Sequence, residues 1–488
     1  MTDAPAAPVS PLRQALRRLT GESLIYGLGQ VSGRAVGLLL VPILTRVLTP
    51  EAYGLADLVM AYSQIALLVL VFGMDASLAR HIYDQPNREA RIRMISTSLM
   101  FRVVSGTVVA LLLALLAIPV VAPLVAGEAY RKYLIIGAVT LPFTLLGLFA
   151  NDVLRVTFQP WKFIALNLVQ TVAVGGITLY LVLARDLGVV GVLYGKLAGD
   201  ALTAVLGLVL CRHLVGWRFH RATLRRMLTY GLPLVPVALG YGIIAAADRF
   251  FLQRTHSLDA VGVYAVAVKF FALASMGVAA FHLAFSPFAY ARARDPESPR
   301  LFARVYSLYV AVASLGALLI SAFAPEIVSL LAPGAYAAAA APALWLTFAA
   351  VAQGAYYVGG LGISLSLRTT LLIGTVGGAA LIAVLANAAL TPALGPSGAA
   401  AATFLGYAAS AVLATLVAQR AYPLPYRCVR MVVMFVLALG IALALQRLTP
   451  PAGGGTGLKL AGAAAYAVVV WVFGLWRHPR ADSAAAGR

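Results

Sequence analysis

Long apolar segments recur along nearly the whole chain, and they constrain the fold more than any other feature. Most of them run for 18 residues or more, which is enough for a helix to cross the roughly 30 Å hydrocarbon core of a bilayer. Residues 27–44, GLGQVSGRAVGLLLVPIL, are typical. The segments are continuously apolar and lack the two-residue alternation of a membrane β-barrel strand. Because lipid offers the backbone no hydrogen bonds, we predict an all-α membrane protein.

About fourteen transmembrane helices fit the sequence. The composition agrees, since only 11% of the residues are charged, against roughly a quarter in soluble proteins. The connections are short and leave no room for a separate soluble catalytic domain. The predicted spans are 22–44, 53–79, 94–123, 131–154, 163–184, 188–211, 228–252, 260–290, 302–323, 338–365, 370–390, 396–418, 431–447 and 459–476.

The orientation follows from the basic residues in alternate connections. One side holds 25 lysines and arginines and the other holds 7. Because cytoplasmic loops carry the excess of positive charge, this bias places both termini in the cytoplasm. The same bias explains the net charge of +20. The predicted partners of this charge are membrane lipids, and no nucleic acid.

A weak internal repeat divides the chain. Residues 26–62 resemble residues 230–271: the tripeptide Tyr-Gly-Leu opens both copies, and Gly54 corresponds to Gly262 at an offset of 208. Both copies start on the cytoplasmic side, and six spans separate them. Chance similarity between two glycine-rich helices is the alternative explanation.

The repeat predicts two pseudo-symmetric six-helix lobes around a central cavity. This is a transporter architecture in which the substrate binds near the bilayer midplane. Two C-terminal helices would be added outside the lobes. The predicted divisions are a cytoplasmic tail with an amphipathic helix (1–21), an N-terminal lobe (22–215), a C-terminal lobe (227–420), spans 13 and 14 (431–476) and a cytoplasmic tail (477–488).

Three motifs resemble a known family. The first span leads into LTPEAYG at 48–54, the seventh reads YGLPLVPVALGYGIIAAADRFFL, and AVGVYAVAVKF follows at 260–270. Together, over about residues 20–480, they resemble polysaccharide-biosynthesis flippases of the multidrug/oligosaccharidyl-lipid/polysaccharide exporter superfamily. The resemblance implies export of a polyprenyl-diphosphate-linked sugar across the bacterial inner membrane, by alternating access through a cationic cavity. It also implies that the last two helices form a groove for the lipid tail, and it suggests polysaccharide-assembly proteins as partners.

Charged residues inside the predicted spans are the candidates for a site. A charge exposed to lipid near mid-bilayer costs about 3 kcal/mol or more, so such residues must face the protein interior or a watery cavity. The basic ones are Arg34, Arg102, Lys196, Arg249 and Lys269, and the acidic ones are Asp57, Asp75, Asp152, Asp200 and Asp248.

Sequence spacing predicts which of these charges pair. Lys196 and Asp200 are four residues apart on one helix face, so they form either a structural ion pair or part of the site. Asp248 and Arg249 are adjacent and point about 100° apart, so we expect no pairing between them. Arg102 is close to a predicted helix end and could extend its side chain to the interface.

Arg34 and Lys269 have no acid three or four residues away. They either pair with Asp57 across helices or bind an anionic ligand, and a diphosphate is such a ligand. We therefore predict that Arg34, Lys196, Arg249 and Lys269 line a cationic cavity that receives the diphosphate. Asp57, Asp200 and Asp248 would then be supporting or ion-coupling acids, with Asp57 the candidate for a coupling cation.

No catalytic constellation is evident. The sequence has no Walker A motif, so ATP is not the direct energy source, and no metal site or cofactor is predicted. The leading hypothesis is a non-enzymatic flippase. One alternative is a multidrug exporter coupled to a cation, which would require an acidic cavity. Another is a membrane glycosyltransferase or polymerase. Such an enzyme would require a large outward loop, and no predicted outward connection here is large.

Overall fold

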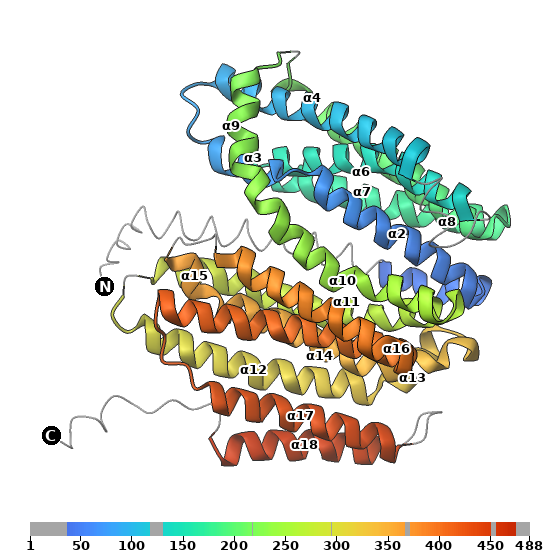
Figure 1. Cartoon of the computed structure of the whole chain (residues 1–488), viewed down its shortest axis with the longest axis vertical. Helices are drawn as coiled ribbons and strands as arrows, with labels where there is room; N and C mark the ends of the chain where they lie inside the picture. Colours follow the sequence, from blue (N-terminus) through green and yellow to red (C-terminus); the bar gives the residue numbers. More distant parts are fainter. Residues whose placement is uncertain are drawn as a thin grey trace, which may run out of the picture.

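The computed structural model describes residues 37–117, 130–216, 218–293, 295–366, 371–449 and 455–474. Within these ranges every regular element is a helix, and most of the long helices run roughly parallel in an elongated molecule (Figure 1). Among the described residues, eleven helices are long and apolar enough to cross a membrane, and two shorter apolar helices, Gly37–Val47 and Thr456–Val472, accompany them. The predicted all-α membrane class is therefore confirmed.

The structure also agrees with about fourteen spans. The helix Leu371–Ala421 has 51 residues, more than twice the roughly 20 that one crossing needs. Its Gly395 leaves helical geometry, with φ 56° and ψ −135°, and Pro392 and Pro396 flank it. The helix thus makes two crossings, at the positions predicted for 370–390 and 396–418.

The first group of helices packs around α6, which contacts α4, α7 and α8, with α2 and α3 alongside. We call α2 to α8 the N-lobe. Single π-helical turns, Leu113–Ala117 and Tyr180–Ala184, extend α4 and α7. Its helices are α2 (Pro50–Leu70), α3 (Met74–His81), α4 (Arg88–Leu112), α6 (Arg131–Val156), α7 (Pro160–Leu179) and α8 (Gly188–Cys211).

The second group packs around α14 and α16, which contact each other and also α10, α11 and α12. We call α10 to α16 the C-lobe. Fully buried alanines such as Ala349, Ala379 and Ala383 let its helices approach closely. Its helices are α10 (Val235–Thr255), α11 (Leu258–Ala291), α12 (Ser298–Ala322), α13 (Ala324–Leu331), α14 (Ala340–Gly359), α15 (Leu361–Leu365) and α16 (Leu371–Ala421).

The second predicted span, 53–79, is broken into α2 and α3. Phe72 and Gly73 both take left-handed backbone conformations, with φ of 49° and 63°. Gly73 also lies against the backbone of Gly231, where a Cβ atom would collide with the Gly231 carbonyl. Only glycine allows both the left-handed φ and the close approach to Gly231. The break between α2 and α3 therefore lies where the chain contacts the segment that leads into the next lobe.

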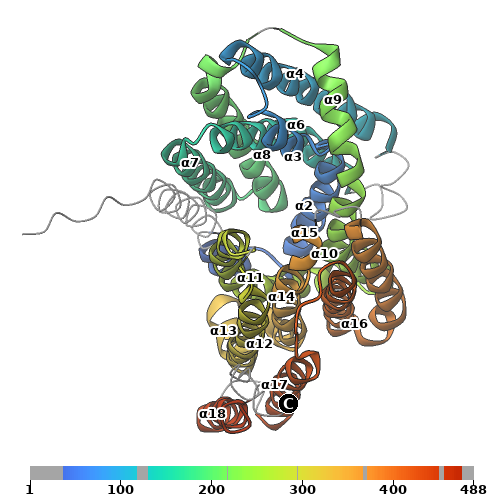
Figure 2. The same ribbon diagram turned by 90° about the vertical axis from the view of Figure 1, so that its left-hand side faces the viewer.

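The seventh predicted span, 228–252, is broken as well and passes from one lobe to the other (Figure 2). Its first part, α9 (Arg221–Gly231), packs against α3 and α4, whereas α10 packs against α16 and α2. A short 3₁₀ turn, Leu232–Leu234, joins them. Pro233 within that turn cannot donate a helical hydrogen bond, which accounts for the break. The predicted lobe boundary at residue 227 therefore falls within a helix that contacts the N-lobe.

The two lobes meet where α2 crosses α11. A Cβ atom on Gly54 would collide with the Leu258 carbonyl, and one on Gly262 would collide with the Pro50 carbonyl. These four residues are related by the same offset of 208 that the sequence repeat shows. The collisions are thus reciprocal, and the crossing lies on the pseudo-twofold axis. Gly54 and Gly262 are required because the two backbones touch there.

Two further helices, α17 (Cys428–Leu448) and α18 (Thr456–Val472), pack on the outside of the C-lobe against α12 (Figure 2). Lys459, at the start of the predicted span 459–476, is one of the seven basic residues counted on the outer side. Lys459 is fully buried on α18, and its ammonium forms an ion pair with Glu326 of α13. The pair holds α18 to the C-lobe.

Candidate functional site

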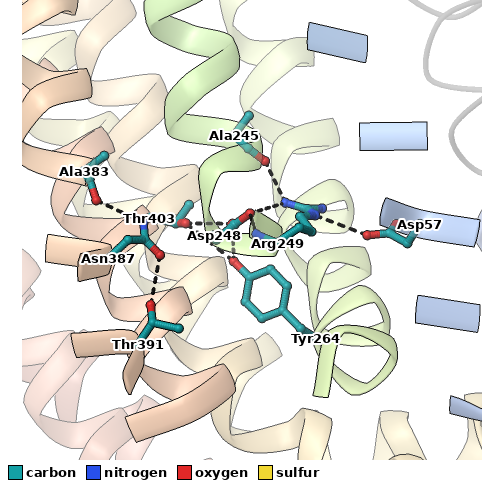
Figure 3. Close-up of polar contacts among 9 residues, drawn as sticks. All are labelled: Asp57, Ala245, Asp248, Arg249, Tyr264, Ala383, Asn387, Thr391 and Thr403. Atoms are coloured by element: carbon teal, nitrogen blue, oxygen red, sulfur yellow. Dashed lines mark hydrogen bonds and ion pairs between the residues drawn. The ribbon is translucent and has the colours of Figure 1, made fainter. Parts of the chain in front are cut away.

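A buried ion cluster joins the two lobes at Arg249 (Figure 3). Arg249 lies on α10 of the C-lobe and its Nε donates to Asp57 Oδ2 of α2, in the N-lobe, at 3.2 Å. Its Nη1 donates to Asp248 Oδ1 at 2.9 Å and to the Ala245 carbonyl at 2.6 Å. One guanidinium therefore contacts acids from both lobes.

Asp248 is the most enclosed member of this cluster, with no exposed surface. Besides Arg249 Nη1, it accepts hydrogen bonds from the backbone N–H of Arg249, the hydroxyl of Tyr264 and Oγ1 of Thr403. The expectation that Asp248 and Arg249 do not pair is wrong. Their Cβ atoms diverge, but the long arginine side chain bends back far enough to reach its neighbour.

Lys269 lies on α11 close to this cluster and is partly buried. The phenol of Tyr53 on α2, the carboxylate of Asp57 and the guanidinium of Arg249 lie near its ammonium. Lys269 forms no ion pair within the described ranges. The C-lobe thus brings two cations and one carboxylate to the interface, and the N-lobe adds the second carboxylate, which leaves the cluster neutral.

A second cluster lies inside the N-lobe around Asp200, which is 1% exposed. Asp200 accepts hydrogen bonds from Lys196 at 2.7 Å, Thr144 at 2.5 Å and Gln170 at 3.0 Å. The predicted Lys196–Asp200 pair is confirmed. Lys196 keeps 28% of its side chain exposed and lines a small hollow together with Gln64.

The side chain of Arg102 does not extend to the membrane–water interface. It is fully buried, and its Nη2 donates to Asp152 of α6 at 2.9 Å. Asp152 also accepts from Arg155 at 3.0 Å. The expectation of an interfacial Arg102 is wrong because α4 packs directly on α6, which turns this face of the helix inward.

The structure brings together four of the seven predicted site residues, namely Asp57, Asp248, Arg249 and Lys269. Lys196 and Asp200 form their own cluster, and Arg34 lies outside the described residues. Sequence reasoning did not foresee Thr403 as a partner. It lies 155 residues from Asp248 and on a different helix, so no local spacing could have indicated it.

Comparison with known families gives a match over more than half of the chain. Residues 19–288 match the family described as polysaccharide biosynthesis protein. The chain belongs to this family. The resemblance inferred from the LTPEAYG and DRFFL motifs is therefore confirmed.

A curated relative and several solved structures are also similar. The chain is 21% identical over 274 residues to the Lsg locus putative protein 1 of Haemophilus influenzae, covering 55% of this chain and 65% of that protein. The alignment thus spans slightly less than two thirds of the relative. The structure of the lipid II flippase MurJ in an inward closed conformation superposes with a TM-score of 0.71, at 12% identity, over 92% of this chain and 99% of that one.

Two transporters of the MATE type share the fold. An inward-facing multidrug resistance transporter of the MOP superfamily gives a TM-score of 0.66 at 15% identity, over 86% of this chain and 96% of its own. The Vibrio cholerae transporter VcmN in its bent form gives a TM-score of 0.57 at 16% identity, over 84% of this chain and 97% of its own. Family and fold together identify a multi-pass membrane protein of the polysaccharide biosynthesis family, with a fold that the MurJ and MATE structures share.

Proposed function

We propose that the protein carries a polyprenyl-diphosphate-linked oligosaccharide from the cytoplasmic to the outer leaflet of a bacterial inner membrane, for cell-surface polysaccharide biosynthesis. It would do so by alternating access, with both termini in the cytoplasm, and would make or break no covalent bond. The observation that carries the proposal is the shared arginine, Arg249, which Asp57 contacts from the opposite lobe.

The charge balance supports a diphosphate as ligand. While the lobes meet, Asp57 and Asp248 neutralise Arg249 and Lys269. When the lobes separate at this point, Asp57 leaves with α2, and one uncompensated positive charge remains on the C-lobe. Arginine offers a planar fork for phosphate oxygens and lysine a point charge. A diphosphate would then replace Asp57 as the partner of Arg249.

The same pairing argues against a multidrug exporter of organic cations. Such a cavity needs an acid that is free to meet the substrate. Within the described ranges, Asp57, Asp152, Asp200 and Asp248 each pair with a basic side chain, and of the five acids inside the predicted spans only Asp75, on α3, does not. A coupling cation could compete with Arg249 for Asp57, so ion coupling is compatible with the proposal.

A place for the lipid tail is available beside the added helices. An apolar hollow of about 280 Å³ lies between α12, α14, α16 and α17, with Val351, Val412 and Phe435 among its lining residues. In this proposal, residues 22–215 and 227–420 move as the two lobes, and α17 and α18 accompany the second one. Polysaccharide-assembly proteins would use the exported product.

Lys269→Gln is the sharpest test, because Lys269 forms no ion pair with any described residue, and its removal therefore leaves no described acid without its ion-pair partner. In vesicles loaded with a fluorescent polyprenyl-diphosphate sugar, we expect transport to fall by roughly tenfold or more. Lys269→Arg should retain most of the rate, and Lys132→Gln, at an exposed position, should leave it unchanged. Normal transport by correctly folded Lys269→Gln would refute the diphosphate role.

A further inference from the structure

The N-lobe carries a second hollow, remote from the lobe interface. It has a volume of about 600 Å³ and is lined by residues from the end of α3, the start of α4 and the end of α6. This volume is within the range of roughly 300–1,000 Å³ typical of small-molecule sites. The basic connections predict that these helix ends lie on the cytoplasmic side, and on that prediction the hollow would be at the level of the lipid headgroups.

Two arginines line this hollow without an acidic partner. Arg88 and Arg91 are one turn apart on α4 and both are exposed. In the part of the chain that the structure describes, neither forms an ion pair. The nearby carboxylates are engaged elsewhere: Asp84 with Arg80 and Arg226, and Asp152 with Arg102 and Arg155; only Glu89 is unassigned.

The rest of the lining is apolar and aromatic. Ile92 and Val156 contribute aliphatic surface, and Tyr83 and Phe158 lie with their ring centroids 6.0 Å apart. Tyr83 donates its hydroxyl to the Val156 carbonyl, and both rings are about half exposed. Exposed aromatic rings are typical of the membrane–water interface. The hollow therefore presents a cationic rim beside apolar walls.

We propose that this hollow binds the headgroup phosphate of an anionic phospholipid, with an acyl chain against the aliphatic wall. Paired guanidinium groups suit a phosphate, and basic pockets between membrane helices on the cytoplasmic side favour anionic headgroups. A headgroup that carries an ammonium would place a third positive charge beside Arg88 and Arg91. The site therefore distinguishes phosphatidylglycerol from phosphatidylethanolamine. It is independent of the transport pathway and of the substrate.

Native mass spectrometry of the detergent-solubilised full-length protein tests this site. We expect phosphatidylglycerol to bind the wild type at least about tenfold more tightly than the double variant Arg88→Gln/Arg91→Gln. The matched control Arg300→Gln/Arg304→Gln removes two exposed arginines at the start of α12 and should bind as the wild type does. Arg88→Lys/Arg91→Lys keeps the charge and should bind with intermediate affinity, which separates loss of the site from misfolding.

Three outcomes would overturn the proposal. One is equal phosphatidylglycerol binding by the wild type and the Arg88→Gln/Arg91→Gln variant. Another is equal binding of phosphatidylethanolamine, which would remove the argument from charge. The third is binding of polyprenyl phosphate or inorganic phosphate in place of phosphatidylglycerol, which would assign the arginines to a different phosphate source.

Discussion

Two aspartates hold Arg249 from opposite sides, and their burial gives them different tasks. The Asp248 side chain has no exposed surface and accepts hydrogen bonds from three other groups besides the guanidinium. The Asp57 side chain is 17% exposed and, in the described part of the chain, has Arg249 as its one ion-pair partner. Asp248 therefore fixes the arginine within the C-lobe, and Asp57 makes a contact that can be exchanged.

Asp248→Asn should destabilise the protein strongly. The amide cannot replace a carboxylate that accepts from Arg249, Tyr264 and Thr403 together, and removing one partner of a buried pair costs about 3–5 kcal/mol. We expect a clear fall in the thermal unfolding midpoint in detergent. Thr403→Val removes the hydrogen bond to Asp248 and a long one, at 3.5 Å, with the Tyr264 hydroxyl, and because neutral partners contribute less it should cost only about 1 kcal/mol. Equal midpoints for Asp248→Asn and the wild type would contradict the structural role of this carboxylate.

The Lys459–Glu326 pair should respond asymmetrically to substitution. Glu326→Gln leaves the fully buried Lys459 ammonium without its counter-charge, which is expensive, at about 3–5 kcal/mol. Lys459→Met removes the buried charge itself and leaves Glu326, whose side chain is 34% exposed, able to meet water. Thermal unfolding should therefore show a larger loss for Glu326→Gln, and the opposite order would contradict this reading.

At the scale of elements, the crossing of α2 and α11 is the tightest contact between the lobes. Its reciprocity matters because alternating access requires the two lobes to separate where they now touch. Gly54 and Gly262 let the backbones meet without side chains between them. The Asp57–Arg249 pair lies less than one turn further along α2. We infer that the glycine crossing and the Asp57–Arg249 pair together close the outer end of the cavity between the two lobes.

Gly54→Ala should shift the protein toward the outward-open state. The added methyl group collides with the Leu258 carbonyl, and overpacking costs about 1–3 kcal/mol, which corresponds to roughly 5- to 150-fold in an equilibrium. A cysteine at Gln64, exposed on α2, would report the opening in a Cys428→Ser background. An impermeant maleimide added outside should then label it faster.

Gly37→Ala is the matched control for this experiment, because nothing lies within 4 Å of a Cβ atom at Gly37. It should label as slowly as the parent protein. If Gly54→Ala also labels slowly, the glycine crossing does not close the outer end.

At the scale of the whole molecule, Asp57→Asn should open the outer end without unfolding the protein. Arg249 keeps Asp248 when Asp57 loses its charge, so the C-lobe remains intact while the lobe contact weakens. A partly buried pair lies between exposed and buried ones, so about 1–3 kcal/mol is expected. Outside labelling of the Gln64→Cys reporter should rise, and the thermal midpoint should change far less than in Asp248→Asn. A midpoint as low as that of Asp248→Asn would contradict the proposed division of tasks.

The apolar pattern of the sequence was sufficient to predict the transmembrane helices, but it did not predict where those helices are broken. Apolar runs predict the crossings because each must span the same hydrocarbon thickness. The break at Leu232–Leu234 has a local cause in Pro233, but the break at Phe72–Gly73 depends on a contact between distant segments, Gly73 against Gly231. A hydropathy profile contains no information about such contacts. The partner of Lys459 could not be predicted for the same reason, since Glu326 lies 133 residues away.

By itself, the sequence determined the membrane class and the spans, because the lipid thickness acts on each segment locally. The charge of the connections predicted the orientation, and short motifs indicated the family. It also indicated that Asp57, Asp248, Arg249 and Lys269 belong inside the bilayer. The tertiary structure alone decided which charge meets which. Asp57 and Arg249 are 192 residues apart, and only the packing of α2 against α10 brings them together. A buried charge is stabilised by whichever partner packing places within reach, and this is a property of the whole fold.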